Sequence, residues 1–553
     1  MVARGGSFQI RTMDINFEEK RVLIVDDVAG MRSSIRTILS NLGVVQVEMA
    51  GTANDAIRRL QAKSFDIIVC DYFLGDGSDG QQLLEQLRHN KLINLSTLFI
   101  MVTAESVYEK VVSAVELAPD DYLIKPFTAD VLKNRLERVI SKKNAFAPIY
   151  RLIEDGKLAE ATQVCAEISK QNSKYTIDLL RLLAELYVTQ GNVEEAQKIY
   201  QQVVDLRAVP WARMGLATMF HCKGNHQEAE TLLETVIEEA PTFMAAYDLL
   251  SKVCEAQAKT ERAQEVLERA VIASPYTMHR QKEMGQLAVR NGDMEAAEQA
   301  FATVVARGKT SFFREADDYA NLSRVQMERG KFDVALSTLR DARTSFSNSP
   351  QVNFTASVME SLVHKKAGND QASAVALATA MQTKQEADIK SSENLTLDLA
   401  KACFAHGKED EAKDLISALV QNNHESQALI QKAKQVFEEA GKGAEGSALV
   451  DSSVKSIIQL NNQGVLKAQQ GDFEGSVKLL TEAATRMPEN VQIVLNAAQA
   501  LLVYIDRVGW NDGYMTSARR YLDVARAKGS THPKLLSISK LAQDVAKKYG
   551  VAA

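Results

Sequence analysis

The chain has 553 residues, 46% apolar and 25% charged, with a net charge of −6 spread along its length. This length predicts several domains or an extended array, and the composition is ordinary for a soluble protein. We expect no nucleic-acid partner, because the basic residues are not concentrated on one face. We expect no membrane insertion, because no uncharged apolar run reaches about 18 residues. The five cysteines are scattered, which predicts neither a disulfide nor a zinc site. With no apolar core for a signal peptide in residues 1–20, we expect a cytoplasmic protein.

Short apolar runs alternate with helical stretches in the first quarter of the chain. The runs are short and rich in β-branched residues, which is typical of buried strands. Such alternation predicts a doubly wound α/β fold with a parallel sheet, whose ligand site lies at the carboxyl ends of the strands. The predicted strands are residues 21–25, 66–70, 98–102 and 121–124, and the predicted helices are 31–42, 53–62, 80–88 and 105–117.

Each of these predicted strands is followed by a polar residue whose side chain can take part in chemistry. Asp26 and Asp27 follow the first, and Asp71, Thr103 and Lys125 follow the others. Three carboxylates in one crevice repel each other unless a divalent cation is present, and an all-oxygen site suits Mg²⁺. Asp71 is then the expected nucleophile. The metal and Lys125 neutralise a transferring phosphoryl group, and the Thr103 hydroxyl hydrogen-bonds one of its oxygens.

Taken together, the motifs resemble the receiver domain of two-component response regulators. They are Val25-Asp26-Asp27 with Met31-Arg32, Asp71-Tyr72-Phe73-Leu74-Gly75 with Asp79-Gly80, Thr103-Ala104, and Asp121-Tyr122-Leu123-Ile124-Lys125-Pro126-Phe127. The resemblance covers residues 20–143 and implies a five-stranded parallel sheet of the CheY-like, flavodoxin-like kind.

The resemblance also implies roles for individual residues. Asp71 takes a phosphoryl group from a histidine kinase or a small phosphodonor, and Asp26, Asp27, Asp71 and the backbone carbonyl of Phe73 hold Mg²⁺. Thr103 and Tyr122 form the switch, although an aromatic residue at a strand end can also serve packing alone.

One stretch departs from the family pattern. Many members carry proline where Gly75 stands, and Gly77-Ser78 lengthens the loop after the nucleophile. We expect an altered loop shape and phosphorylation lifetime. The pair Lys142-Lys143, by contrast, is predicted to be no more than a solvated helix surface or a helix end.

After residue 150, amphipathic helices separated by short turns repeat with a regular frame. A turn glycine is followed five residues later by an anchor alanine, or by a close variant of this pair. Residues four and seven positions beyond each anchor are small or apolar, which predicts one inward stripe on each second helix. The ten anchors are Ala161, Ala196, Ala229, Ala263, Ala297, Ala335, Ser373, Ala412, Ser476 and Ala518, the last preceded by Gly513.

The repeat resembles the tetratricopeptide repeat, a pair of antiparallel helices of about 34 residues. Pro241, Pro275 and Pro488 each stand twelve residues after an anchor, at that repeat's closing position. We expect about ten units in an all-α solenoid with a long concave binding surface. The predicted division is an extension 1–19, a receiver domain 20–143, a linker 144–150, a solenoid 151–545 with a flexible break near 441–447, and a tail 546–553.

The favoured hypothesis is a response regulator of a bacterial two-component system that signals through protein–protein interaction rather than DNA binding. Its expected partners are a sensor histidine kinase or phosphotransfer protein and an unknown protein on the solenoid, with homo-oligomerisation left open. It is not an enzyme beyond its own phosphorylation and dephosphorylation. The alternative is a phosphate sink that hydrolyses phosphoryl groups on Asp71, with the repeats serving only to dock the kinase.

Overall fold

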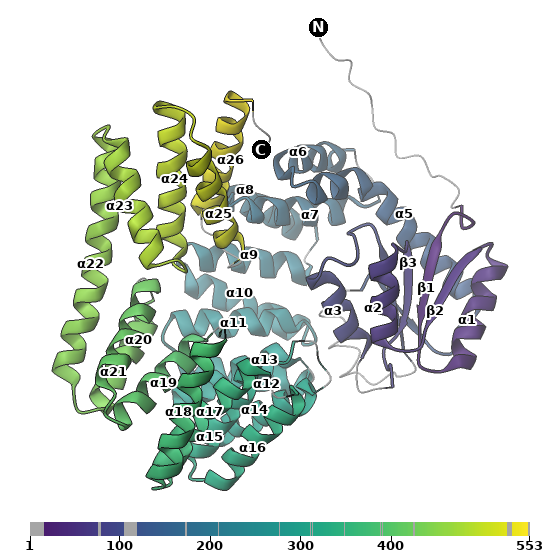
Figure 1. The fold of residues 1–553 in the computed structure, drawn as a ribbon. Helices are drawn as coiled ribbons and strands as arrows, with labels where there is room; N and C mark the ends of the chain where they lie inside the picture. Colours follow the sequence, from purple (N-terminus) through teal and green to yellow (C-terminus); the bar gives the residue numbers. More distant parts are fainter. Residues whose placement is uncertain are drawn as a thin grey trace. The chain divides into compact units, whose positions relative to one another are not determined.

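A computed structural model describes residues 16–550 except 76–78, 104–118, 172–173, 208, 276, 310, 312, 348, 388, 390, 424–425 and 528–532. It divides into two compact units, Met1–Arg314 and Glu315–Ala553 (Figure 1). Within the described part of the chain, no helix combines the length and apolarity needed to cross a bilayer.

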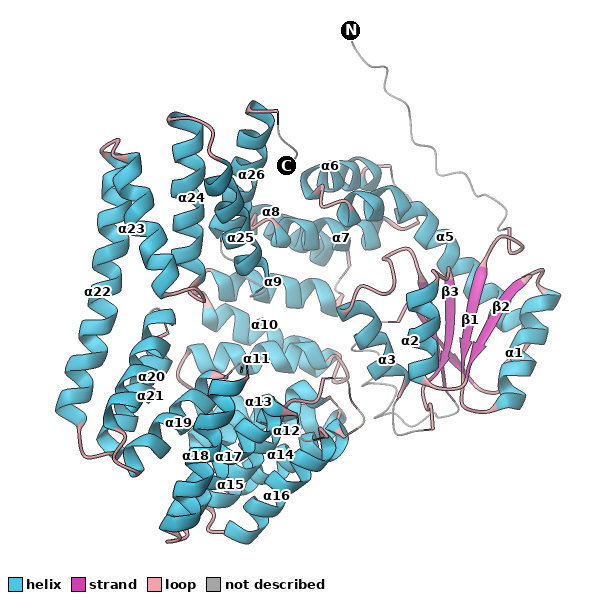
Figure 2. Cartoon of the chain, in the orientation of Figure 1, coloured by secondary structure: helices cyan, strands magenta, loops and turns pink. Residues whose placement is uncertain are grey.

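The first unit begins with a five-stranded parallel sheet, drawn in magenta in Figure 2. The strand order β2-β1-β3-β4-β5 places β1 beside β3 and confirms the predicted doubly wound class. The edge strand β2 is half-exposed and less apolar than the others, so no apolar run marks it in the sequence. The strands are β1 Arg21–Val25, β2 Gln46–Ala50, β3 Ile67–Asp71, β4 Leu98–Thr103 and β5 Asp121–Ile124.

Alternate residues of each strand enter two separate cores on opposite faces of the sheet. On one face, Ile24 and Ile100 pack with Ile35 of α1 (Ala29–Asn41) and Leu136 of α5 (Ala129–Glu154). On the other, Leu23, Ile68 and Phe99 pack against α2 (Ala53–Ala62) and α3 (Gly80–His89). The helices predicted at 31–42, 53–62 and 80–88 are therefore present. The predicted helix 105–117 and the residues Gly77, Ser78 and Ala104 lie outside the described residues.

The helix α5 extends beyond residue 143, the predicted end of the receiver domain. It runs from Ala129 to Glu154 without interruption, so residues 144–150, predicted as a short linker, are helical. Pro148 lies inside this helix, where its missing N–H removes one backbone hydrogen bond. The helix continues because Phe146 and Ile149 are buried in the core of the first repeat.

The rest of the first unit is a series of helices in which each packs against the next. They are α6 Leu158–Ser169, α7 Thr176–Thr189, α8 Val193–Leu206, α9 Pro210–Cys222, α10 His226–Glu239, α11 Met244–Ala256, α12 Thr260–Ala273, α13 Met278–Asn291 and α14 Met294–Gly308.

The second unit is also built of packed helices. They are α15 Ala316–Glu328, α16 Phe332–Ser345, α17 Pro350–Lys366, α18 Asp370–Glu386, α19 Glu393–Ala405, α20 Glu409–Asn422, α21 Gln427–Glu439, α22 Gly443–Gln469, α23 Phe473–Arg486, α24 Val491–Arg507, α25 Asp512–Ala527 and α26 Pro533–Lys548.

All ten predicted anchors are buried, and so are the ten residues four positions beyond them. The close approach of paired helices depends on small residues. A Cβ atom on Gly215 of α9 would lie 2.3 Å from the Tyr200 ring, and one on Gly285 would lie 2.7 Å from the Phe301 ring. These distances are far below van der Waals contact, so only glycine fits there without a shift in the neighbouring helix.

Two details of the predicted repeat are wrong. Gly513 is not a turn glycine, because it lies in the first turn of α25. The stretch 441–447 is not a flexible break. Gly441 forms a left-handed turn with φ +72°, and α22 starts two residues later. Gly446, five residues after Gly441, lies against Phe437, so this stretch contains a further turn and anchor of the same frame.

Candidate functional site

The carboxyl ends of four strands bring the predicted site residues to one edge of the sheet. Asp26 and Asp27 follow β1, Asp71 ends β3 and Thr103 ends β4. Lys125 follows β5, and its backbone N–H donates a 2.7 Å hydrogen bond to the Thr103 carbonyl. Because all these strands are parallel, residues far apart in the chain meet at this edge.

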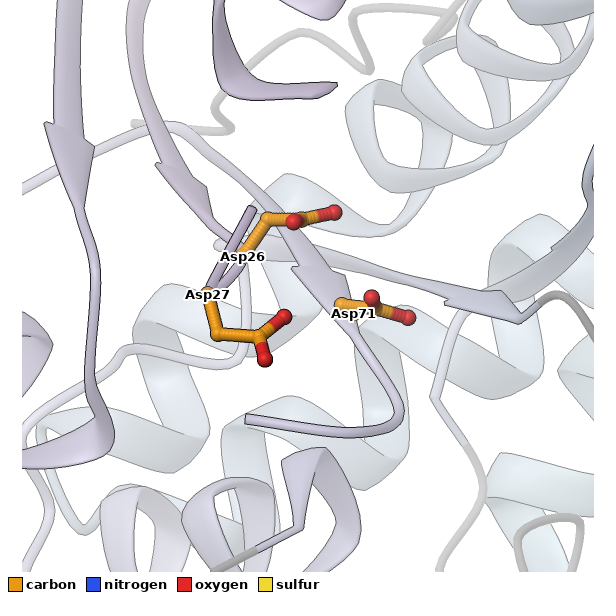
Figure 3. Close-up of side chains that lie close together, drawn as sticks. All are labelled: Asp26, Asp27 and Asp71. Carbon is orange, nitrogen blue, oxygen red and sulfur yellow. The ribbon is translucent and has the colours of Figure 1, made fainter. Parts of the chain in front are cut away.

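The three aspartates form a compact group of ligand atoms. A carboxylate oxygen of each lies within 4.8 Å of the others. Asp26 is 1% exposed and Asp71 8% exposed, whereas Asp27 is open to solvent. Figure 3 shows the three side chains lying close together. The cluster is thus buried on one side and open on the other.

Lys125 lies between two of these carboxylates. Its Nζ is 2.8 Å from Asp71 Oδ2 and 2.9 Å from Asp26 Oδ2, and its side chain is 12% exposed. One ammonium against three carboxylates leaves two negative charges. A divalent cation would cancel them, and the carboxylate oxygens are the hard ligands that Mg²⁺ prefers. The residues present therefore fit Mg²⁺.

Burial and charge act in opposite directions on the pKa values of Asp71 and Lys125. Burial raises the pKa of the Asp71 carboxyl, and the hydrogen bond from Lys125 offsets only part of that rise. Burial alone would lower the pKa of Lys125, but its hydrogen bonds to Asp71 and Asp26 outweigh this and raise it. The ammonium form of Lys125 is thus held in place at the nucleophile.

Arg32 is a site residue to which the sequence assigned no role. Its Nη1 donates to the backbone carbonyl of Asp26 at 2.5 Å, while Asp26 Oδ1 accepts from the backbone N–H of Val28 at 2.8 Å. These bonds fix the main chain and side chain of Asp26 together. The motif Met31-Arg32 was the available signal, but its contact depends on how α1 packs at the end of β1.

Two glycines shape the loop after Asp71. Gly75 has φ +75°, a conformation that proline cannot adopt, so the departure from the family pattern has a backbone cause. A Cβ atom there would also lie 3.1 Å from Asp27 Oδ2. A Cβ atom on Gly80 would lie 2.3 Å from the backbone oxygen of Asp71, so glycine lets α3 begin directly against the nucleophile.

The remaining predicted residues lie around this cluster. Thr103 is 5% exposed. The Phe73 side chain is 43% exposed, and the predicted role of Phe73 as a metal ligand concerns its backbone carbonyl alone. The Tyr122 ring packs against the core that contains Leu83 and Leu87. Its buried hydroxyl has no hydrogen-bond partner among the described residues, and burial raises its pKa. The ring is thus turned toward the protein interior.

Comparison with known families supports the two-part organisation of the chain. A model of the response regulator receiver domain matches residues 22–137. Models of the tetratricopeptide repeat match residues 152–219, 210–235 and 282–350. The chain thus consists of a receiver domain followed by a long helical region with tetratricopeptide repeats.

Three similar proteins each cover 22% of this chain. The chemotaxis protein CheY of Pseudomonas aeruginosa is 34% identical over 125 residues, which are 22% of this chain and 98% of CheY. The chemotaxis protein CheY-3 of Vibrio cholerae is 32% identical over 123 residues, 22% of this chain and 92% of the relative. A solved structure of the chemotaxis response regulator CheY4 of Vibrio cholerae is 28% identical, covers 22% of this chain and 98% of its own, and has a TM-score of 0.20.

Proposed function

The chain belongs to the response regulator family through its receiver domain, and we propose that it accepts a phosphoryl group on Asp71 and signals through its helical repeats. The phosphodonor is a sensor histidine kinase, a phosphotransfer protein or a small phosphorylated molecule. The output is binding of another protein to the repeats in the cytoplasm, without contact to nucleic acid.

In this proposal, a carboxylate oxygen of Asp71 attacks the phosphorus of the donor's phosphohistidine. An O–P bond forms and the N–P bond breaks, its electron pair remaining on the imidazole nitrogen, which then takes up a proton. The Nζ atom of Lys125, which lies 2.8 Å from Asp71 Oδ2, then neutralises the negative charge on the phosphoryl oxygens. The Thr103 hydroxyl donates a hydrogen bond to one of those oxygens, and Tyr122 responds to the movement of Thr103.

Asp26, Asp27, Asp71 and the backbone carbonyl of Phe73 would hold Mg²⁺, which supplies neutralising positive charge for the phosphoryl oxygens. Arg32 keeps Asp26 in position through the backbone carbonyl of that residue. Burial of Asp26 and Asp71 limits competition from water for these contacts.

The observation that carries this proposal is the contact of the Lys125 ammonium with two carboxylates of the three-aspartate cluster, those of Asp26 and Asp71. The test is incubation of the full chain with acetyl phosphate and Mg²⁺, followed by intact-mass and peptide mass spectrometry. We expect one added phosphoryl group, on Asp71, which is lost in Asp71→Asn and absent when EDTA replaces Mg²⁺. Modification elsewhere, or modification independent of Mg²⁺, would contradict the proposal.

The phosphate-sink alternative differs in lifetime and output. Affinity capture with wild type and Asp71→Asn, each treated with acetyl phosphate, identifies proteins retained in one state alone. A phosphorylation lifetime of many minutes with a change in retained partners supports a switch. A lifetime of seconds with identical partners supports the sink.

A further inference from the structure

The helix α5 belongs to two hydrophobic cores at once. Leu132, Leu136 and Ile140 pack into the core on one face of the β-sheet. Phe146 and Ile149, on the next turns, are fully buried with Leu179 and other residues of the first helical repeat. A rigid helix that serves two cores cannot shift in one without disturbing packing in the other.

Lys143 lies between these two cores and is not the solvated residue that the sequence indicated. Its Nζ is 2.9 Å from Asp120 Oδ1, and it also donates to the carbonyls of Leu95 at 2.5 Å and Thr97 at 3.2 Å. The side chains of Lys143 and Asp120 are only 15% and 17% exposed. The neighbouring Lys142 is 41% exposed, so the two lysines have different environments.

Asp120 connects this lysine to the strand that carries the predicted switch. It immediately precedes β5, and its Oδ2 accepts a 2.8 Å hydrogen bond from the backbone N–H of Phe99 in β4. Its own N–H donates to the Phe99 carbonyl at 2.9 Å. The strand then leads through Tyr122 to Lys125 at the aspartate cluster.

The repeat side of α5 contributes to the same cluster of contacts. The Lys143 ammonium lies 5.6 Å from the centre of the Tyr150 ring, two turns further along the helix. Glu154, at the end of α5, accepts a 2.8 Å hydrogen bond from the backbone N–H of Leu95. The segment from Leu95 to Thr97 is therefore held by two residues of α5, Lys143 near its middle and Glu154 at its end.

We propose that Lys143, with Asp120, Leu95 and Thr97, forms a clamp that couples the position of β5 to the first helical repeat. This inference rests on the proposed phosphorylation of Asp71 and names how that event would be transmitted. When β5 adjusts to a modified site, Asp120 moves with it and pulls on Lys143. Since α5 is continuous, the displacement reaches Phe146 and Ile149 in the repeat core.

The test compares full-length wild type with Lys143→Met, which keeps an apolar stem of similar length and removes the ammonium. Lys133→Met is the matched control, because Lys133 is on the same helix, is 47% exposed, and has only a distant partner at 3.9 Å in Glu137. Each protein is incubated with Mg²⁺ with or without beryllium fluoride, a phosphoryl mimic. Hydrogen exchange is then followed in α6 and α7, and thermal unfolding confirms that the variants fold.

In wild type and Lys133→Met, we expect beryllium fluoride to change exchange rates in α6 and α7 by about fivefold or more. In Lys143→Met, the change should be largely lost, while phosphorylation by acetyl phosphate stays close to wild type. Asp120→Asn, which weakens the ion pair from its other side, should show the same loss if it folds.

The outcomes separate the two proposals. If wild type takes up no phosphoryl group on Asp71, the proposed function fails. If wild type is phosphorylated but Lys143→Met retains the full response in α6 and α7, the function stands and the clamp is overturned. A phosphorylated wild type with no response in these helices also overturns the clamp.

Discussion

At the scale of single residues, the aspartate cluster depends on a balance of charge. Lys125 is the cation that the described structure places against Asp71 and Asp26, and both carboxylates are nearly buried. Each charge in such a place needs a partner, because burial penalises an unpaired ion. Removing Lys125 should therefore leave the carboxylates of Asp71 and Asp26 without the cation that balances them, unless Mg²⁺ is bound.

Lys125→Met should slow phosphorylation of Asp71 by acetyl phosphate on the order of 10²-fold, the usual cost of losing one group that stabilises developing charge. Mg²⁺ affinity should be kept or increased, since the competing ammonium is gone. Rates from intact-mass time courses and Mg²⁺ titrations measure the two effects. A variant that phosphorylates at the wild-type rate would remove Lys125 from the mechanism.

The cysteines offer a second prediction about single residues. Burial raises the pKa of the Cys165 thiol to about 12 and those of Cys254 and Cys403 to about 11, and it raises that of Cys70 well above its usual value. Cys222 is exposed. Because the thiolate is the reactive form, iodoacetamide at pH 8 should modify Cys222 first, by peptide mass spectrometry.

In the four buried cysteines, modification should become appreciable only as pH rises or the chain unfolds. Early labelling of Cys165 at pH 8 would show that the first repeat opens readily. Denatured protein provides the control, since all five thiols should then react at similar rates.

At the scale of helices and turns, the repeats place a left-handed residue between paired helices. Glycine serves this purpose at most of these turns, because it has no Cβ to clash. Ala258 occupies the turn between α11 and α12 with φ +59°. Its Cβ atom therefore introduces backbone strain that the glycine turns avoid.

Ala258→Gly should raise the free energy of unfolding by up to about 1 kcal/mol, because removing the Cβ relieves this strain. The control is Ala302→Gly in the exposed middle of α14, which should lower it by about 1 kcal/mol. Urea midpoints of the first unfolding transition measure both. Destabilisation by Ala258→Gly would mean that chain entropy outweighs the strain.

At the scale of the whole molecule, ion pairs connect distant repeats within the second unit. Arg324 of α15 donates to Asp398 of α19, 74 residues away, through Nε at 3.1 Å and through Nη2. The Asp398 side chain is 8% exposed and that of Arg324 25%. Removing one partner leaves the other charge poorly solvated.

Asp398→Ala should destabilise the second unit by about 2 to 3 kcal/mol, less than for a fully buried pair because Arg324 keeps contact with water. Arg324→Met combined with Asp398→Leu should recover part of this loss. Lys365→Met, which breaks an exposed pair with Asp370, should leave the free energy of unfolding close to that of wild type. Urea unfolding monitored by circular dichroism measures all three.

Much of the fold was predictable because its signals are local. The strand ends before Asp27, Asp71 and Lys125 are marked by apolar runs, and the repeat frame by turn glycines and anchors at fixed offsets. The edge strand β2 was not predicted, because a half-exposed strand has only a weak pattern of apolar residues. The stretch 441–447 was misjudged because glycine marks both flexible segments and tight turns.

The amino-acid sequence alone was enough to place three carboxylates and a lysine at one sheet edge and to predict a helical repeat array, because both depend on spacing along the chain. The continuity of α5 through Pro148 and the partners of Arg32 and Lys143 emerged only in the folded molecule. They depend on which surfaces pack together across long separations, such as Leu95 with Glu154, and no local periodicity encodes that choice.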